Sequence, residues 1–311
     1  MRTSPLLNWA RLLRAPNLLT APGDALGGLF LLATAAARPV HAPALLLVSL
    51  ASVAAYAFGI LTNDLFDLEE DRRCRPERPL PSGAIGTRAA LLAALALALA
   101  SLALAWLIAP PALLADAALL ACILLYNGLA KRRRLPGALV MGLCRGLNVL
   151  LGAACVLPAG ATAAALSPAL PPALGVTAII AAVTWLADGE TRVQTPGRLV
   201  FLPAAATLVA WLAAAPALPY PAIFAYGAFS LSFLLAALAA GQFFTLALAF
   251  YDHETTPATL PPVIGAHIRT LIPWQLSWIL LGNSLHAAVA AVALLLAWWL
   301  ARRLARHLPQ S

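Results

Sequence analysis

The sequence contains few charged residues, and this scarcity excludes a soluble globular domain. Only 10% of its 311 residues are Asp, Glu, Lys or Arg, whereas 62% are hydrophobic. A soluble globular protein has roughly a quarter charged and half apolar residues. Several apolar runs reach the roughly 20 residues with which a helix crosses the hydrocarbon core of a bilayer. The composition therefore indicates an integral membrane protein with several spans.

The scarcity of other residue types and patterns further limits the class of membrane protein. Ala and Leu outnumber Val and Ile, and no ten-residue segments of alternating polarity occur, which excludes an outer-membrane β-barrel. The four cysteines form no close pair and no metal-like spacing, so we expect small core residues. We recognise no soluble domain, no internal repeat and no cleavable signal peptide. We therefore expect one transmembrane domain over residues 1–311.

Nine apolar segments predict the fold class. Their length is typical of membrane helices, so we expect an all-α, polytopic helical bundle of about nine transmembrane helices. The segments are 17–37, 43–63, 89–109, 112–130, 138–157, 172–187, 199–215, 222–250 and 271–300.

The basic residues indicate how the chain crosses the membrane. The net charge is +8, and the Lys and Arg residues cluster at alternate connections. This pattern is typical of topology signals and contacts with anionic lipid headgroups, so we expect no nucleic-acid partner. The positive-inside rule places the N-terminus and the even-numbered exits in the cytoplasm. Arg302, Arg303 and Arg306 would then lie outside, so either the tail is an exception or one span is miscounted.

The second predicted span ends in an acidic motif, residues 63–71 (NDLFDLEED). On a continuous helix, four of its oxygen-bearing side chains fall within an arc of roughly 100°. Like charges at one place are unfavourable without a cation, and Mg²⁺ commonly bridges carboxylates and substrate phosphates. The predicted metal ligands are Asn63, Asp64, Asp67 and Asp71.

An arginine- and proline-rich loop, residues 72–83, follows the acidic motif at once. Guanidinium groups bind phosphate oxygens well, so the metal ligands and this loop together suit a phosphate ester. The alternative is a solvated helix end with ordinary cytoplasmic positive charge. The predicted phosphate ligands in the loop are Arg72 and Arg75.

The acidic motif and this loop resemble the first aspartate-rich motif of the UbiA family of membrane prenyltransferases. The resemblance implies a UbiA-like fold in which Asp67 and Asp71 are catalytic and, with Asn63, hold Mg²⁺ on the diphosphate of an isoprenoid donor. Tyr126 and Lys131 resemble the family's tyrosine and lysine after the fourth span. The tyrosine is thereby implied to line the pocket and the lysine to bind the diphosphate. On physical grounds alone, the basic run at Lys131 is also typical of a topology anchor.

Arg145 and Asn148 lie three residues apart in the fifth predicted span, on one helix face. A charge at membrane depth costs about 2.5–3.5 kcal/mol on insertion scales, so it usually faces a polar cavity or a partner. We expect both side chains to bind the diphosphate. The alternative is an arginine that snorkels to the interface.

The segment after the sixth span departs from the family pattern. Members carry a second aspartate-rich motif there, whereas this sequence offers Asp188, Glu190 and Arg192. The two acids are predicted second metal ligands, and Arg192 either binds the diphosphate or replaces a cation. This departure is similar to the UbiA-like branch encoded in the bacterial Ebo operon.

The resemblance implies a Mg²⁺-dependent prenyltransferase that moves an isoprenoid chain from a prenyl diphosphate to an unidentified small acceptor. We expect contact with membrane lipid, a location in the bacterial inner membrane and an active site that faces the cytoplasm. One rival is a non-catalytic protein that binds or transports isoprenoids or lipids. Another is a phosphatidyl-type alcohol transferase, of whose motif only the Asp-Gly at 188–189 is present.

Overall fold

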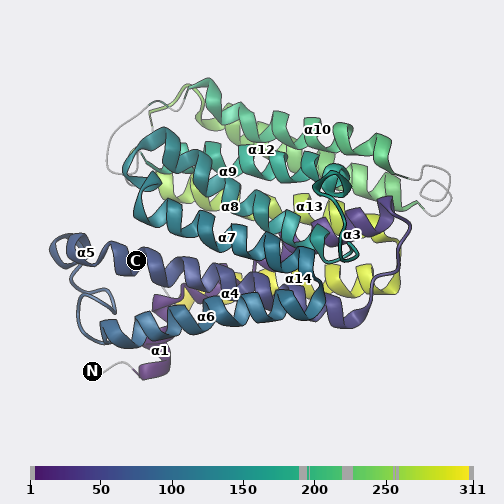
Figure 1. The fold of residues 1–311 in the computed structure, drawn as a ribbon. Helices are drawn as coiled ribbons and strands as arrows, with labels where there is room; N and C mark the ends of the chain where they lie inside the picture. Colours follow the sequence, from purple (N-terminus) through teal and green to yellow (C-terminus); the bar gives the residue numbers. More distant parts are fainter. Residues whose placement is uncertain are drawn as a thin grey trace.

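The computed structural model describes residues 4–188, 195, 197–218, 227–254, 256 and 259–307. All regular structure in these residues is helical, which confirms the all-α prediction (Figure 1). The α-helices are α1 (Pro5–Leu12), α2 (Ala15–Leu18), α3 (Pro22–Ala35), α4 (Ala42–Phe66), α5 (Leu68–Cys74), α6 (Thr87–Ile108), α7 (Pro110–Gly128), α8 (Arg134–Ala154), α9 (Leu170–Ala187), α10 (Leu202–Ala214), α12 (Ala228–Phe250), α13 (Leu260–Ile279) and α14 (Leu285–His307). Short 3-10 helices are η1 (Ala130–Arg132), η2 (Ala163–Ala169), η3 (Arg198–Phe201), η4 (Ala215–Ala217) and η5 (Leu280–Gly282).

Eight of the helices in the described part of the chain are long and apolar enough to cross a membrane. They contain α4, α6, α7, α8, α9, α10, α12 and α14. The shorter α3 packs inside the bundle against α8, α13 and α4, and α13 packs against α12 and α3. The protein is therefore an integral membrane protein, and the observed bundle agrees with the expected number of about nine helices.

The last predicted span, 271–300, is wrong, because the structure divides it between two helices. α13 ends at Ile279, and Asn283 adopts a left-handed conformation (φ 35°) before α14 begins. At this break, the carbonyl of Leu281 accepts a hydrogen bond from Thr34 near the end of α3. α14 starts there and extends back for 23 residues, about 34 Å. Its end lies on the side of the molecule that carries α1 and α5 (Figure 1). The miscounted span thus explains why the basic tail did not fit.

α6 and α7 show how the bundle separates lipid from core. α6 fully buries only a stripe of small residues against α4 and α7, while five of its leucines are exposed: Leu91, Leu92, Leu95, Leu99 and Leu107. Ser101 in this stripe donates hydrogen bonds to the carbonyl of Ala51 and to Asp116 on α7, at 3.0 and 2.9 Å. Asp116 is fully buried, so this polar contact is a helix-to-helix link inside the membrane region.

α3 and α8 approach each other more closely than side chains would allow. A Cβ atom on Gly152 of α8 would lie 1.7 Å from the carbonyl oxygen of Ala25, and one on Gly28 of α3 would lie 2.0 Å from that of Val149. Glycine at both points lets the two backbones touch, as is common between membrane helices. This contact fixes the register of α3 against α8 and places Asp24 opposite Arg145.

Candidate active site

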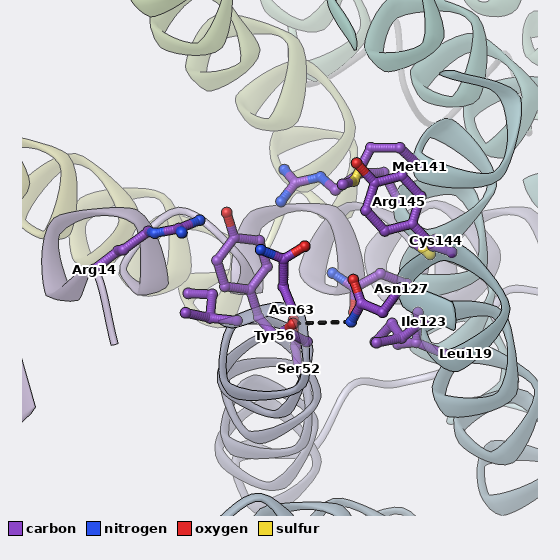
Figure 2. Close-up of a pocket in the computed structure, with 14 residues that line it drawn as sticks. Arg14, Ser52, Tyr56, Asn63, Leu119, Ile123, Asn127, Met141, Cys144 and Arg145 are labelled. Atoms are coloured by element: carbon purple, nitrogen blue, oxygen red, sulfur yellow. Dashed lines mark hydrogen bonds between the residues drawn. The ribbon is translucent and has the colours of Figure 1, made fainter. Parts of the chain in front are cut away.

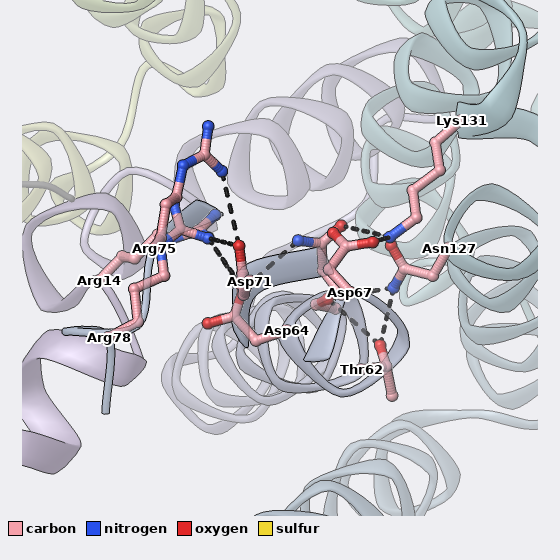
Figure 3. Close-up of polar contacts among 11 residues, drawn as sticks. Arg14, Thr62, Asp64, Asp67, Asp71, Arg75, Arg78, Asn127 and Lys131 are labelled. Atoms are coloured by element: carbon pink, nitrogen blue, oxygen red, sulfur yellow. Dashed lines mark hydrogen bonds and ion pairs between the residues drawn. The ribbon is translucent and has the colours of Figure 1, made fainter. Parts of the chain in front are cut away.

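The acidic motif does not form one continuous helix. α4 ends at Phe66 and α5 begins at Leu68, with Asp67 between them at φ −92° and ψ 2°. The amide of Asp67 still donates to the carbonyl of Asn63, at 3.0 Å, so the interruption is small. Figure 3 shows that Asp67 lies toward Lys131, whereas Asp64 and Asp71 lie toward the arginines. The expectation of one continuous helix is therefore wrong, and the acidic side chains meet two different sets of cations.

Lys131 joins two of the predicted ligands. It lies in η1, directly after α7, and its Nζ is 2.6 Å from Asp67 Oδ1 and 3.2 Å from Asn63 Oδ1 (Figure 3). The side chains of Lys131 and Asp67 are 17% and 27% exposed, so the pair is largely shielded from solvent. The topology-anchor alternative does not describe Lys131, because its ammonium group turns inward onto α4. It places a cation between two oxygens of the acidic motif.

Arg14 pairs with Asp64, and sequence reasoning missed its role by counting it as a topology signal. Its Nη2 donates to Asp64 Oδ1 at 2.9 Å, from the turn between α1 and α2. Arg14 holds a positive φ of 46°, which is uncommon for a residue other than glycine. Such conformations concentrate at functional sites. Only the folded chain reveals this backbone geometry.

The proline-rich loop brings Arg78 to Asp71 alongside Arg75, which is one of the two arginines predicted as phosphate ligands. Arg78 contacts both oxygens of Asp71, at 3.0 and 2.9 Å, and its side chain is only 10% exposed. Arg75 lies 3.7 Å from Asp71 with a half-exposed side chain. Arg72 pairs with Glu69 on the exposed surface of α5, so the structure does not bring it to the other predicted ligands.

A cavity of about 270 Å³ opens beside the acidic motif, between α4, α7 and α8 (Figure 2). Its polar lining includes four of the predicted site residues, Asn63, Tyr126, Arg145 and Asn148, and adds residues that were not predicted. The unpredicted polar lining residues are Arg14, Ser52, Tyr56 and Asn127, and the apolar walls are Ile60, Leu119, Ile123 and Met141. The space is thus apolar along its walls and cationic at its ends.

Asn127 links two walls of this cavity. Its side-chain amide donates to Thr62 Oγ1 and to the carbonyl of Gly59, at 2.8 and 3.1 Å. The bonds hold the end of α7 against α4, directly before Lys131. The distance between Lys131 and the acidic motif therefore depends on a buried helix-to-helix contact.

Arg145 enters the cavity from α8 and does not snorkel to the interface. Its side chain is 11% exposed, and its Nε lies 2.6 Å from Asp24 Oδ2 on α3. Asn148, one turn further, donates to the carbonyl of Ala21 at 3.0 Å. The buried carboxylate supplies the partner that an arginine at membrane depth requires.

Of the predicted second motif, Asp188, Glu190 and Arg192, the described residues include only Asp188. Asp188 lies 3.4 Å from Arg134, which also stacks on Trp185 at 4.2 Å from the ring centroid. Asp188 does not line the cavity. Glu190 and Arg192 lie outside the described residues.

The donor set of the acidic motif fits Mg²⁺ only as a shared site. Among the residues that the structure describes, no three Asp, Glu, His or Cys side chains are grouped so that they could hold a metal ion. Asn63 Oδ1 and Asp67 Oδ1, however, already converge on one cation, the ammonium of Lys131. Mg²⁺ keeps several waters and is usually bound by one or two carboxylates together with substrate phosphates. These oxygens therefore fit a Mg²⁺ whose remaining ligands come from a diphosphate.

Comparison with known proteins places the chain in a family. A sequence profile described as the UbiA prenyltransferase family matches residues 25–261. Digeranylgeranylglyceryl phosphate synthase of Ignicoccus hospitalis is 37% identical over 145 residues, which cover 46% of this chain and 46% of that protein. The synthase of Thermococcus gammatolerans is 42% identical over 114 residues, 36% of this chain and 41% of that protein. The chain thus matches less than half of the length of each of these two relatives.

Solved structures agree in fold. A UbiA homolog from Archaeoglobus fulgidus bound to DMAPP and Mg²⁺ has a TM-score of 0.60 at 17% identity, covering 94% of this chain and 99% of that chain. A UbiA homolog from Aeropyrum pernix K1 has a TM-score of 0.59 at 20% identity, covering 84% of this chain and 96% of that chain. Because the family profile covers more than half of the sequence, the protein belongs to the UbiA prenyltransferase family.

Proposed function

We propose that this protein is a Mg²⁺-dependent prenyltransferase that moves an isoprenoid chain from a prenyl diphosphate to a small acceptor. One observation carries the proposal: an apolar-walled cavity lies directly beside carboxylates and cations that pair across three segments of the chain. A prenyl diphosphate has the same two-part chemistry, an apolar tail and a charged head. Buried charges this close together are otherwise expensive in a membrane protein.

The rim residues would hold the head group. Asn63 and Asp67, with Asp64 and Asp71 beside them, are the residues that would hold Mg²⁺. When bound, the ion neutralises charge on the leaving diphosphate. Lys131 and Arg14 leave their carboxylate partners and bind diphosphate oxygens. Arg78, from the arginine- and proline-rich loop, stays next to Asp71. Opposite charges placed where charge develops lower the barrier to C–O cleavage.

The cavity walls would hold the reacting carbon. Cleavage of the C–O bond leaves both electrons on the diphosphate and an allylic cation on the isoprenoid. Ile60, Leu119, Ile123 and Met141 exclude water that would quench this cation. A nucleophilic oxygen or carbon of the acceptor then forms the new bond and loses a proton.

The acceptor and the membrane location are parts of the same proposal. The relatives are named as digeranylgeranylglyceryl phosphate synthases, so glycerol phosphate, bare or already carrying one prenyl chain, is the first acceptor to test. The basic residues at the rim favour an active site that faces the cytoplasm of a plasma membrane. Asp188, Glu190 and Arg192 stay predictions for a second metal or diphosphate contact.

Turnover by purified protein tests the function. Release of pyrophosphate is measured with Mg²⁺, glycerol phosphate and prenyl diphosphates of increasing length. We expect release that stops when EDTA is added. A protein that binds prenyl diphosphates but never releases pyrophosphate, with any acceptor offered, would instead support the non-catalytic lipid-binding rival. That rival also predicts little change in lipid binding or transport when Asp67 and Asp71 are substituted with asparagine.

A further inference from the structure

The deep end of the cavity contains a buried network that the diphosphate rim proposed above does not include. Asp24 on α3 is fully buried, with one oxygen 2.6 Å from Arg145 Nε and the other accepting from Gln275 Nε2 of α13 at 2.8 Å. Gln275 Nε2 also donates to the carbonyl of Thr20, at 3.3 Å. Residues of α3 and α13 thus hold the guanidinium group that α8 carries.

This network has little freedom to move. The α3 and α8 backbones touch at their glycines, as described above, and a Cβ on Gly23 would lie 2.2 Å from Gln275 Oε1. Asp24 and Gln275 do not line the cavity, whereas Arg145 does. Their role toward any ligand therefore passes through the direction in which they hold Arg145.

Five buried polar atoms of this network have no hydrogen-bond partner among the described residues. Asp24 Oδ2 and Arg145 Nε face each other as an ion pair, and Gln275 Oε1 belongs to a residue that does not line the cavity. The other two, Arg145 Nη2 and Asn148 Oδ1, belong to residues that line it. The two residues are 9% and 6% exposed and both line the cavity (Figure 2 labels Arg145). Buried polar groups are nearly always satisfied, so a donor and an acceptor without partners, on two residues that line one cavity, indicate a ligand. The donor requires an accepting oxygen, and the acceptor requires a hydroxyl.

We infer that Arg145 and Asn148 form the acceptor subsite, that it takes a small molecule carrying both an oxyanion and a hydroxyl, and that Asp24 and Gln275 are positioning residues for Arg145. The inference rests on the proposed function, since it assigns the second substrate to the same cavity. It separates the two substrates in space: the diphosphate lies at the Lys131 rim and the acceptor head group lies against α3 and α8.

Binding of matched probes tests the subsite. Calorimetric titrations of the full-length protein in detergent use glycerol phosphate, propyl phosphate, which lacks the hydroxyls, and glycerol, which lacks the oxyanion. Each is measured with and without saturating Mg²⁺ and pyrophosphate at the rim. We expect glycerol phosphate to bind at least about tenfold tighter than either of the others, because each lost hydrogen bond leaves a buried group unpaired. Equal affinities for the three probes would overturn the inference.

A double-mutant cycle tests the positioning role. Asp24→Asn and Arg145→Gln should each weaken glycerol phosphate binding about tenfold, and the double variant should lose no more than Arg145→Gln alone. Losses that add in full would mean that Asp24 acts on the fold and not through Arg145. Gln275→Met, which removes the amide at similar size, should weaken binding in the same direction. Wild-type affinity in both Asp24→Asn and Gln275→Met would contradict the positioning role.

The control is Asp116→Asn, a buried carboxylate on α7 that makes the same kind of interhelical hydrogen bond away from the cavity. It should bind all probes as the wild type does. Failure of the wild type to bind Mg²⁺ with pyrophosphate would contradict the proposed function. Intact rim binding without a preference for glycerol phosphate would contradict only the acceptor subsite.

Discussion

Asp67→Asn should have opposite effects on pyrophosphate binding in the absence and presence of Mg²⁺. In the structure, Asp67 holds the ammonium of Lys131 at 2.6 Å, so Lys131 must leave this carboxylate before it binds a diphosphate. The two side chains are 17% and 27% exposed, so the pair is intermediate between surface and buried ion pairs. Surface pairs contribute up to about 1 kcal/mol, and breaking a buried pair costs about 3–5 kcal/mol. We therefore expect the release of Lys131 from Asp67 to cost about 1–2 kcal/mol, which corresponds to about 5–30-fold in affinity.

Without Mg²⁺, the variant should therefore bind pyrophosphate about 5–30-fold tighter than the wild type, because Lys131 is already free. With Mg²⁺, it should bind more weakly, and prenyl transfer should fall about 10²–10³-fold, because a ligand that acts on the developing charge is lost. Calorimetric titration with pyrophosphate in EDTA and then in Mg²⁺ measures both effects.

Glu69→Gln is the matched control, since Glu69 lies two residues from Asp67 and pairs with Arg72 on the exposed surface. It should leave both titrations unchanged. The reasoning would be refuted if Asp67→Asn weakened pyrophosphate binding in EDTA, or if Glu69→Gln reproduced its effects.

Three further changes probe the rim, the helix contact and the cavity walls. Arg14→Gln should lower turnover about tenfold or more, because one cation leaves the rim, and should also lower the melting temperature in detergent, because the buried Asp64 loses its ion-pair partner. Gly152→Ala should destabilise the fold by at least about 1–3 kcal/mol in thermal unfolding, since the new methyl group meets a helix backbone; Gly241→Ala, where no atom lies within 4 Å, should not. Ile123→Trp should reduce affinity for prenyl diphosphates in titrations and leave Mg²⁺–pyrophosphate binding unchanged, because only the tail meets this wall.

The sequence by itself determined the fold class and the location of the site along the chain. Membrane helices are set by long apolar runs, since an unpaired backbone in lipid is too costly. The acidic motif was found because carboxylates are rare in such a chain, and Arg145 because a charge inside a span is rare, whereas only the family resemblance indicated Lys131. A charged side chain at membrane depth is costly, so it usually faces a partner or a polar cavity.

Only the tertiary structure decided which charges meet. Arg14 pairs with Asp64 across 50 positions, and Asp24 meets Gln275 across 251, so no local spacing indicates either contact. The acidic motif meets Lys131 through Asp67 and arginines through Asp64 and Asp71, and only the packing of the partner segments decides which carboxylate meets which cation. Hydropathy does not indicate where a chain reverses direction. The split of the last predicted span at Asn283 was therefore visible only in the structure.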